Sequence, residues 1–359
     1  MARWTLVAFL PNGTALSELT DASDRKITAR LSDPSTIEWS MRGTDPAAAV
    51  IDELATDVIA YRDNVPVIRG RVGPSADDLS GDSHRVTFAA PDYRSLLGRR
   101  TVWAGSTNAY LSTDQATIAM DLIADSQALV GGNLGISQGA TTLTGRLRDR
   151  AYEEGKSLGE AIDQLADVVD GFDWDIGVSL TFDLYYPRRG RPKDFVAHWG
   201  STVTSLRRSV DPSGYANAVR VSGATGTTAV SSAVADLASR PEGRWEAQVG
   251  YTDVSNQSTV AEKAAYELAE RSVIRPSYTA TLRPGVWQGP GALWLGDECR
   301  LVVRSGRLDV NTTVRVHEVA VSADDDGNET VDVTFDRPRS SFVRRVTDAE
   351  RQVVNLERR

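Results

Sequence analysis

Alternation of hydrophobic and polar positions predicts β-strands through much of residues 1–101. The segment Trp4–Leu10 alternates before a Pro-Asn-Gly turn and is expected to form a first hairpin. One or two further strands are expected around Asp33-Pro34, and β-branched runs on both sides of Arg62-Asp63-Asn64 predict another hairpin. A later strand, "HRVTFAAP", is expected to break at Pro91, because proline cannot donate to a strand ladder. The region therefore reads as a β-rich domain.

One helix is expected inside this domain. Asp45 is a suitable N-cap acceptor, and Pro46 suits the first helical position. Val50, Ile51 and Leu54 would then lie on one face of the helix.

Helical periodicity dominates residues 102–204, which we expect to form an inserted α/β domain. Residues 112–130 carry an apolar stripe that ends at Gly131-Gly132. The stripe consists of Ala116, Ile118, Ala119, Leu122 and Ile123. A second helix begins at Ser157, which forms a capping box with Glu160, and Gly171 is expected to end it. Its stripe consists of Leu158, Ile162, Leu165 and Val169. A hairpin with Gly177 near its turn follows in "FDWDIGVSLTFDLYYP".

Strand signals return in residues 205–345, which we expect to form one or more C-terminal β domains that partly complete the first domain. Strands are predicted at residues 217–221 and 244–254 and in the closing segments after residue 291. A helix capped by Thr259 and Glu262 reaches about Val273. Residues 223–243 are rich in Ala, Ser, Thr and Gly and are expected to be a mobile insertion. The predicted fold class is α+β, mainly β, with tube-like β-barrel or sandwich domains and the α/β insertion.

Residues 346–359 predict a short C-terminal helix with a candidate docking stripe. Thr347 and Glu350 form a capping box. The apolar stripe consists of Val346, Ala349, Val353 and Leu356, at heptad spacing. Two heptads are too short for a stable free coiled coil, so the stripe packs either on its own domain or on a partner subunit.

Composition narrows the classes of function. At 359 residues the chain is long enough for two or three domains, and it has no run of about 18 apolar residues, so no membrane span is expected. The N-terminal segment lacks a small-residue cleavage site and is interpreted as a strand and not a secretion signal. A net charge of −9 argues against a nucleic-acid binder held by phosphate contacts. Cys299 is the only cysteine, which excludes an internal disulfide and fits a reducing cytoplasm.

The sequence carries only weak signals for a catalytic or metal site. His84, His198 and His317 are far apart, and no GxSxG or HExxH motif accompanies them, so they are interpreted as strand residues. The acidic segment "SADDDGNET" does not fit a calcium loop of the EF-hand type, and Asp326-Gly327 predicts a hairpin turn instead. We therefore expect no metal and no cofactor.

Three carboxylates near aromatic residues, Asp173, Asp175 and Asp183, are of the kind that glycosidases use. Asp173 and Asp175 lie two residues apart on one strand face, on either side of Trp174. Paired catalytic carboxylates normally come from separate elements at a set distance. A structural role is therefore favoured over catalysis.

The ordered set of these packing patterns resembles the tail hub or minor tail protein family of long-tailed phages that infect actinobacteria. The resemblance rests on these segments, in order: "YRDNVPVIRGRV", "APDYRSLL", "GKSLGEAIDQLADVVDGFDWDI", "YANAVRVSG" and "GALWLGDECRLVV". It covers most of residues 1–340, and each segment is a packing pattern without chemistry.

The resemblance implies a structural virion protein and not an enzyme. Such a hub is expected to be a homotrimer at the tail tip, in which each copy contributes two similar β domains and the ring so matches a hexameric tail tube. The expected partners are the distal tail protein, the tape measure protein and other minor tail or receptor-binding proteins, and genomic DNA passes through at ejection without specific binding. The hub is assembled in the host bacterial cytoplasm. The chain ends soon after the hub region, so receptor binding and wall digestion are expected on other proteins.

Some alternatives stay open. The negative net charge fits a lumen that does not hold DNA, because like charges repel. Scattered arginine pairs such as Arg207-Arg208 are either a solvated surface or contacts with acidic neighbouring rings. A cell-wall glycan hydrolase would have convergent carboxylates in a cleft. A carbohydrate-binding adhesin would expose an aromatic platform made from some of the eight tryptophans.

Overall fold

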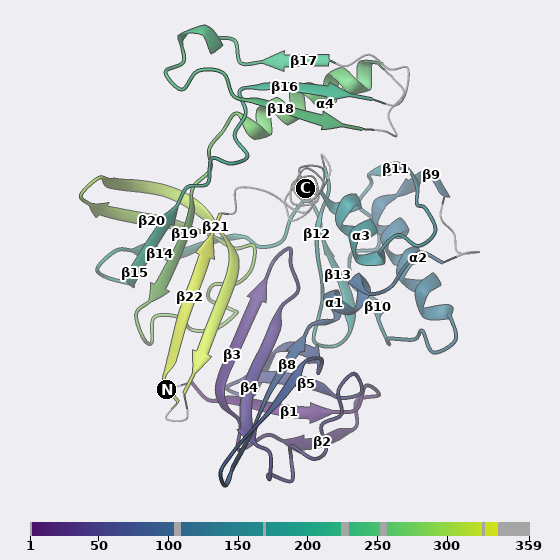
Figure 1. The fold of residues 1–359 in the computed structure, drawn as a ribbon, viewed down its shortest axis with the longest axis vertical. Helices are drawn as coiled ribbons and strands as arrows, with labels where there is room; N and C mark the ends of the chain where they lie inside the picture. Colours follow the sequence, from purple (N-terminus) through teal and green to yellow (C-terminus); the bar gives the residue numbers. More distant parts are fainter. Residues whose placement is uncertain are drawn as a thin grey trace. The chain divides into compact units, whose positions relative to one another are not determined.

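The computed structural model describes residues 2–103, 109–167, 170–223, 230–251, 257–324 and 327–336. These residues form two compact units: one contains the chain up to Arg207 together with Thr279–Phe335, and the other contains Arg208–Tyr278 (Figure 1). Strands predominate over helices, so the predicted class, α+β and mainly β, is confirmed. The division of the chain at residues 101, 204 and 345 stays a prediction.

The N-terminal strands form a four-stranded sheet in the order β2-β1-β5-β6. Its strands are β1 (Trp4–Phe9), β2 (Ala15–Glu18), β5 (Asp57–Arg62) and β6 (Val65–Arg71). Both predicted hairpins are confirmed, since β1 pairs antiparallel with β2 and β5 with β6. Asp63 and Asn64 both have positive φ (50° and 65°), as a two-residue type I′ turn requires.

A second, long sheet connects segments from both ends of the first unit. Its main path runs β15-β19-β22-β21-β3-β4-β8-β7. These strands are β3 (Ser23–Arg30), β4 (Thr36–Arg42), β7 (Ser75–Ser80), β8 (Ser83–Pro91), β15 (Val203–Ser209), β19 (Ser277–Leu282), β21 (Leu308–Ala323) and β22 (Glu329–Phe335). Off this path, β20 (Glu298–Ser305) pairs with β21 and with β14 (Pro192–His198). One face of the sheet is apolar and buried, and Trp39 stacks on Phe88 there with ring centroids 5.2 Å apart.

The expected helix after Asp45 is absent, and this prediction was wrong. Residues 43–54 form turns, in which the Asp45 carboxylate accepts a hydrogen bond from the Ala47 N–H. Only Ile51 is buried, whereas Val50 and Leu54 are 40% and 61% exposed. In a helix, Val50 and Leu54 would have no apolar surface of the protein to pack against. The Asp45 carboxylate therefore stabilises a turn instead of a helix N-terminus.

In residues 102–204 the observed helices agree closely with the predicted ones. Helix α1 (Tyr93–Gly98) precedes this region, and α2 (Gln115–Ala128) and α3 (Leu158–Ala166) bury their predicted apolar stripes in one core, except that Val169 lies outside the described residues. The short strands around them are β9 (Ala109–Asp114), β10 (Ser137–Gln138), β11 (Leu147–Ala151), β12 (Asp173–Ile176) and β13 (Thr181–Tyr185). Ser157 caps α3 as predicted, but the C-cap is Asp167 and not Gly171, so that boundary was wrong.

The second unit contains a small sheet in the order β17-β16-β18 with one helix. The elements are β16 (Ala218–Ser222), β17 (Val230–Ala233), η1 (Leu237–Ser239), β18 (Glu246–Gly250) and α4 (Gln257–Arg271). Val260 and Ala264 of α4 pack on Val219 and Val221 of β16. The segment predicted as a mobile insertion, 223–243, contains regular structure in its described part, because β17 pairs with β16 along its length. Backbone pairing with a buried neighbour stabilises a strand of small residues that has little apolar surface of its own.

Two predicted features lie outside the described residues. They are the C-terminal stripe of Val346, Ala349, Val353 and Leu356, and Asp326 of the closing turn. The hairpin around that turn is present, because β21 and β22 pair antiparallel and Gly327 has a φ of 79°. No helix among the described residues is long and apolar enough to cross a membrane.

Candidate functional site

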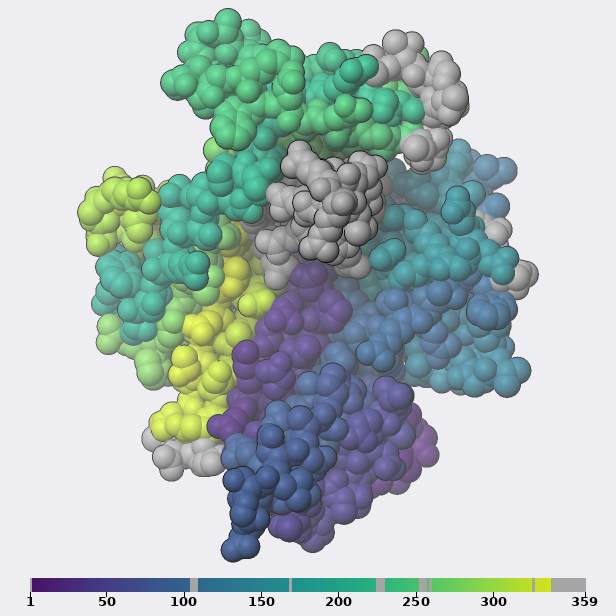
Figure 2. All heavy atoms as spheres, in the orientation of Figure 1, coloured from purple at the N-terminus to yellow at the C-terminus, as the bar shows by residue number. Residues whose placement is uncertain are grey.

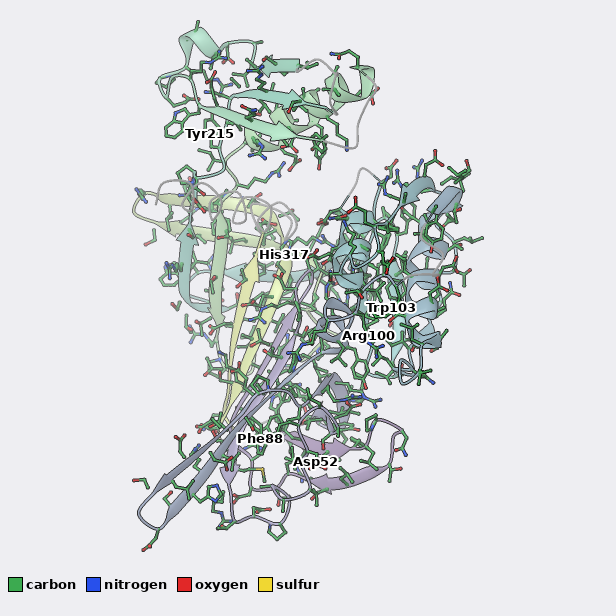
Figure 3. The ribbon with its side chains drawn as sticks, turned by 45° about the vertical axis from the view of Figure 1, so that its right-hand side comes forward. Asp52, Phe88, Arg100, Trp103, Tyr215 and His317 are labelled. Carbon is green, nitrogen blue, oxygen red and sulfur yellow. The ribbon has the colours of Figure 1, made fainter. Side chains whose placement is uncertain are left out.

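The histidines and the cysteine do not form a catalytic group. His84, His198 and His317 lie on three different strands, β8, β14 and β21, as predicted. His317 is labelled in Figure 3. His84 Nε2 lies 2.7 Å from an oxygen of Asp77 on the neighbouring strand. Cys299 is buried in β20, with 2% of its surface exposed. Across the described segments, no group of three His, Cys, Asp or Glu has the arrangement of a metal site.

Two of the candidate carboxylates are bound to arginines. Asp173 accepts hydrogen bonds from the Arg315 guanidinium and, at 2.6 Å, from the Arg189 N–H. Asp175 is paired with the Arg189 guanidinium, which also lies 4.8 Å from the centroid of the Tyr185 ring. These contacts tie β12 to β21, so both carboxylates act as structural anchors.

The third carboxylate, Asp183, is packed between two glycines. Burial raises the pKa of Asp183, while a hydrogen bond from the Thr181 hydroxyl at 3.1 Å lowers it. A Cβ atom on Gly139 or Gly177 would lie only 2.4 Å or 2.9 Å from its carboxylate oxygens. The backbone at both glycines therefore packs directly against the Asp183 carboxylate.

Asp57 is the centre of a buried charged cluster. Its side chain is fully buried, and it pairs with the guanidinium groups of Arg69, at 2.6 Å, and Arg71. The Tyr93 hydroxyl donates to the same carboxylate at 2.7 Å. Burial and the charge of Asp57 raise the pKa of Tyr93 to about 12, so the phenol stays a donor at neutral pH. The Asp57 carboxylate therefore connects the segment that contains Arg69 and Arg71 with the segment that contains Tyr93.

The residues on either side of Tyr93 extend this connection. Asp92 caps α1 and also accepts from the Ser35 N–H at 2.8 Å. Arg94 pairs with Asp163 of α3, donates to the Trp174 carbonyl at 2.9 Å, and has its guanidinium 3.8 Å from the centroid of the Trp174 ring. Sequence reasoning placed these residues in a motif but did not identify their partners, because no local pattern records pairs 69 or 80 residues apart.

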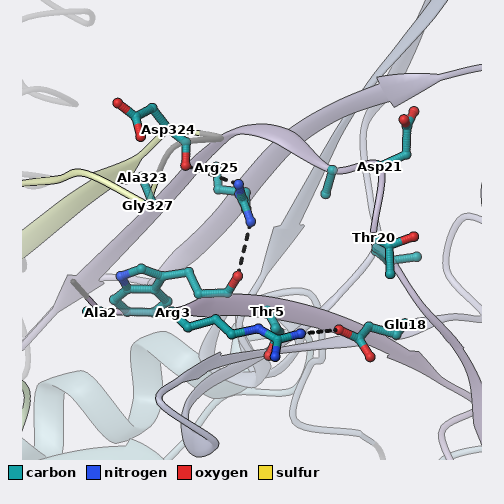
Figure 4. A pocket seen from close by; sticks show the side chains of 13 residues that line it. Ala2, Arg3, Thr5, Glu18, Thr20, Asp21, Arg25, Ala323, Asp324 and Gly327 are labelled. Atoms are coloured by element: carbon teal, nitrogen blue, oxygen red, sulfur yellow. Dashed lines mark hydrogen bonds and ion pairs between the residues drawn. The ribbon is translucent and has the colours of Figure 1, made fainter.

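An open pocket of about 520 Å³ lies beside the N-terminal strand (Figure 4). Its polar groups already bind one another. The Arg25 guanidinium donates to the backbone oxygens of Trp4 and Asp324 at 3.0 Å and 3.1 Å, and Arg3 pairs with Glu18 at 3.5 Å. The two basic side chains that line the pocket, Arg3 and Arg25, are therefore engaged within the protein.

The exposed tryptophans come from separate segments. Trp103, Trp199 and Trp245 are 56%, 36% and 50% exposed. Trp245 packs edge-on against Tyr215 and donates to the Glu242 carbonyl at 2.9 Å, which fixes it within its own loop. In the parts of the chain that the structure describes, these three do not stack on one another.

The long sheet has a polar face opposite its apolar face, and this is the most extended feature of the first unit. Directly paired residues share a face, so the register of the strands identifies its members. They include Asp78, Arg85, Thr87, Ser40, Glu38, Lys26, Thr36, Thr28, Arg30, Ser322, Glu318, Thr330, Asp332 and Thr334. Half of these residues carry hydroxyl groups and half carry charges, and only Thr28 and Ser40 of this set are buried.

The basic side chains of this polar face are bound to carboxylates. Arg30 pairs with Glu318 at 2.8 Å and Lys26 with Glu38 at 3.8 Å. Arg42 pairs with Asp21 at 2.7 Å, and Arg85 pairs with Asp24. The polar face therefore presents hydroxyls and neutralised ion pairs, and it is not strongly basic.

The chain is similar in structure to phage tail proteins. It matches the tail protein of Neisseria meningitidis MC58 with a TM-score of 0.68 at 12% identity, over 93% of this chain and 96% of that chain. It matches the 43 kDa tail protein of prophage MuSo2 from Shewanella oneidensis with a TM-score of 0.68 at 15% identity, over 93% and 98%. The prophage tail protein gp18 of Listeria monocytogenes gives 0.60 at 11% identity, over 99% and 100%.

No protein-family model matches the sequence, and no curated protein matches it either. At these low identities the structural matches establish the fold alone. The chain has the fold of phage tail proteins over nearly its whole length.

Proposed function

We propose that this chain is a structural hub protein of a phage tail tip, and that three copies form the ring that closes the tail tube. The observation that carries the proposal is the eight-strand path of the long sheet. The structural similarity of the chain to tail proteins supports it. The path divides into β15-β19-β22-β21 and β3-β4-β8-β7, which are joined by the pairing of β21 with β3. Two four-strand halves per copy would let three copies match six tube subunits.

The polar face of the long sheet would line the channel through this ring. DNA is held by free lysine and arginine side chains that replace its counterions. Lys26, Arg30, Arg42 and Arg85 are each already paired with a carboxylate, so they offer little attraction to phosphate. Such a surface would let genomic DNA pass at ejection without binding it.

The partners follow from the sequence resemblance to the tail hub family of actinobacterial phages. They would be the distal tail protein, the tape measure protein and other minor tail or receptor-binding proteins. The chain would be assembled in the host cytoplasm and would act at the tail tip of the virion. Its role would be mechanical and not enzymatic, which agrees with Asp173, Asp175 and Asp183 serving as structural groups.

Electron microscopy of the purified full-length chain tests this proposal. We expect particles with threefold symmetry and a central channel whose wall carries the polar face. Incubation of the same preparation with peptidoglycan is expected to release no soluble sugar. Turnover of peptidoglycan by a monomeric particle would contradict the proposal and favour the hydrolase.

A further inference from the structure

Among the described residues, the path of the long sheet ends in two edge strands. Strand β7 forms one end of the eight-strand path, and β15 forms the other. An edge strand presents unpaired N–H and C=O groups on its outer side, which are able to pair with another strand. The β7–β8 hairpin also projects from the body of its unit (Figure 2), and every residue of β7 after Ser75 is exposed.

The two edges carry opposite charge. Strand β7 contains Asp77 and Asp78, and Asp82 lies in the turn that follows; β15 contains Arg207 and Arg208. Asp77 binds His84, but within the described part of the chain Asp78, Asp82, Arg207 and Arg208 have no ion pair or side-chain hydrogen bond. This contrasts with the polar face, where the basic groups are paired with carboxylates. Unpaired exposed charges of opposite sign at the two ends of one sheet are complementary between copies.

The directions of the strands allow the edges to meet. Successive strands from β22 to β7 are antiparallel. At the other end, Thr204 Oγ1 donates to the Thr281 carbonyl and the Arg283 N–H to the Thr202 carbonyl, so β15 and β19 are also antiparallel. Thr281 binds Asp332 and Thr279 binds Thr334, which gives the same relation between β19 and β22. Along eight alternating strands, the first and the last run in opposite directions.

We propose that β7 of one copy docks antiparallel beside β15 of the next copy, so that the acidic edge that carries Asp78 and Asp82 lies against the basic edge that carries Arg207 and Arg208. The inference rests on the proposed ring and identifies the contact that closes it. Two β7 edges would repel each other, and so would two β15 edges, since like charges directly opposite are unfavourable. The contact is therefore head-to-tail, which is the arrangement that generates a closed ring when its rotation permits.

Charge reversal tests this contact, with the mass in solution as the readout. Asp78→Arg with Asp82→Arg places positive charge on both edges, and Arg207→Glu with Arg208→Glu places negative charge on both. Each double variant is expected to lose the trimer and run as a monomer. The chain that carries all four substitutions has complementary edges again and is expected to recover the trimer.

A mixture of the two double variants gives a further result that a merely unfolded protein would not give. Each contact then needs one copy of each kind, so contacts alternate around the assembly. A ring of three cannot alternate, and we expect pairs or even-numbered assemblies but no trimer. Circular dichroism checks that every variant is folded.

Matched controls reverse exposed charges away from both edges. Glu153→Arg with Glu154→Arg, before α3, and Arg304→Glu with Arg307→Glu, in the β20–β21 hairpin, are expected to keep the mass of the unmodified chain. If the edge variants stay trimeric, or if the fourfold variant does not recover the trimer, the edge contact is wrong while the ring stands. If the unmodified chain is monomeric at every concentration, the ring itself is contradicted.

Discussion

At the scale of single residues, the charged side chains of the segments that carry the family resemblance serve structure. Asp57 has no exposed surface, yet Arg69, Arg71 and Tyr93 all direct hydrogen bonds at its carboxylate. Removing one partner of a buried charge group leaves the others without compensation, which costs much more than the net contribution of the intact pair. Such a cluster therefore fixes how strands β5 and β6 and helix α1 meet.

Substitution of Asp57 by alanine tests this role. We expect the free energy of unfolding to fall by about 3–5 kcal/mol, because two buried guanidinium groups lose their counter-ion. Asp309→Ala is the matched control, because Asp309 is 83% exposed and lies 3.7 Å from Arg304, and its loss is expected to cost about 0–1 kcal/mol. Urea denaturation of both variants measures the difference. Equal losses of unfolding free energy in the two variants would show that the buried Asp57 cluster contributes no more to stability than an exposed ion pair.

Asp92 predicts a dependence of stability on pH. Burial raises its pKa from 3.8 to about 6, against the N–H groups of Ser35 and Ser95 and the charge of Arg94. The folded state therefore binds the proton more tightly than the unfolded state, so this contribution to stability is full below about pH 4 and is lost as pH rises through 6. A shift of about 2 pKa units corresponds to about 3 kcal/mol.

The Asp92→Asn variant isolates that contribution. The difference in unfolding free energy between the unmodified chain and the variant is expected to favour the unmodified chain more at pH 4.5 than at pH 7.5. Urea titrations at both pH values measure it, and groups common to both proteins cancel. A difference that does not change with pH would contradict the assignment.

At the scale of elements, the turns decide which strand pairs form. Asp63 and Asn64 adopt the left-handed region at φ values of 50° and 65°, and together with a one-residue register shift between Ala60 and Tyr61 they set the register of β5 and β6. That register places Arg69 and Arg71 beside Asp57. The turn and the buried cluster therefore depend on each other.

Two substitutions at Asn64 test the turn. Asn64→Val is expected to cost about 1–2 kcal/mol, since a β-branched residue disfavours the left-handed region. Asn64→Gly is expected to change the stability by less than about 0.5 kcal/mol, because glycine adopts that region freely. Thermal and urea unfolding provide the comparison, and a valine variant as stable as the glycine variant would rule out strain at this position.

The sequence predicted elements better than it predicted contacts. The strands around Asn64 and the stripe of α2 follow directly from periodicity, so they were found. The helix after Asp45 failed because a good cap does not supply an apolar surface to cover Val50 and Leu54. The partners of Arg94 and Asp57 could not be predicted, because ion pairs between distant segments leave no pattern in the sequence.

At the scale of the whole molecule, a single sheet runs through the first unit and ends in two unlike edges. The basic groups of its polar face are paired with carboxylates, whereas Asp78, Asp82, Arg207 and Arg208 at its two edges have no ion pair among the described residues. This difference separates a surface suited to letting DNA pass from surfaces suited to binding a second copy. Both assignments require the ring.

The mass of the full-length chain in solution, measured by light scattering on a sizing column, tests the ring most directly. We predict a species at three times the 38.9 kDa of the chain. The fraction of this species is expected to rise with protein concentration, as association requires. A monomer at every concentration would contradict the ring and direct attention back to the adhesin and hydrolase alternatives.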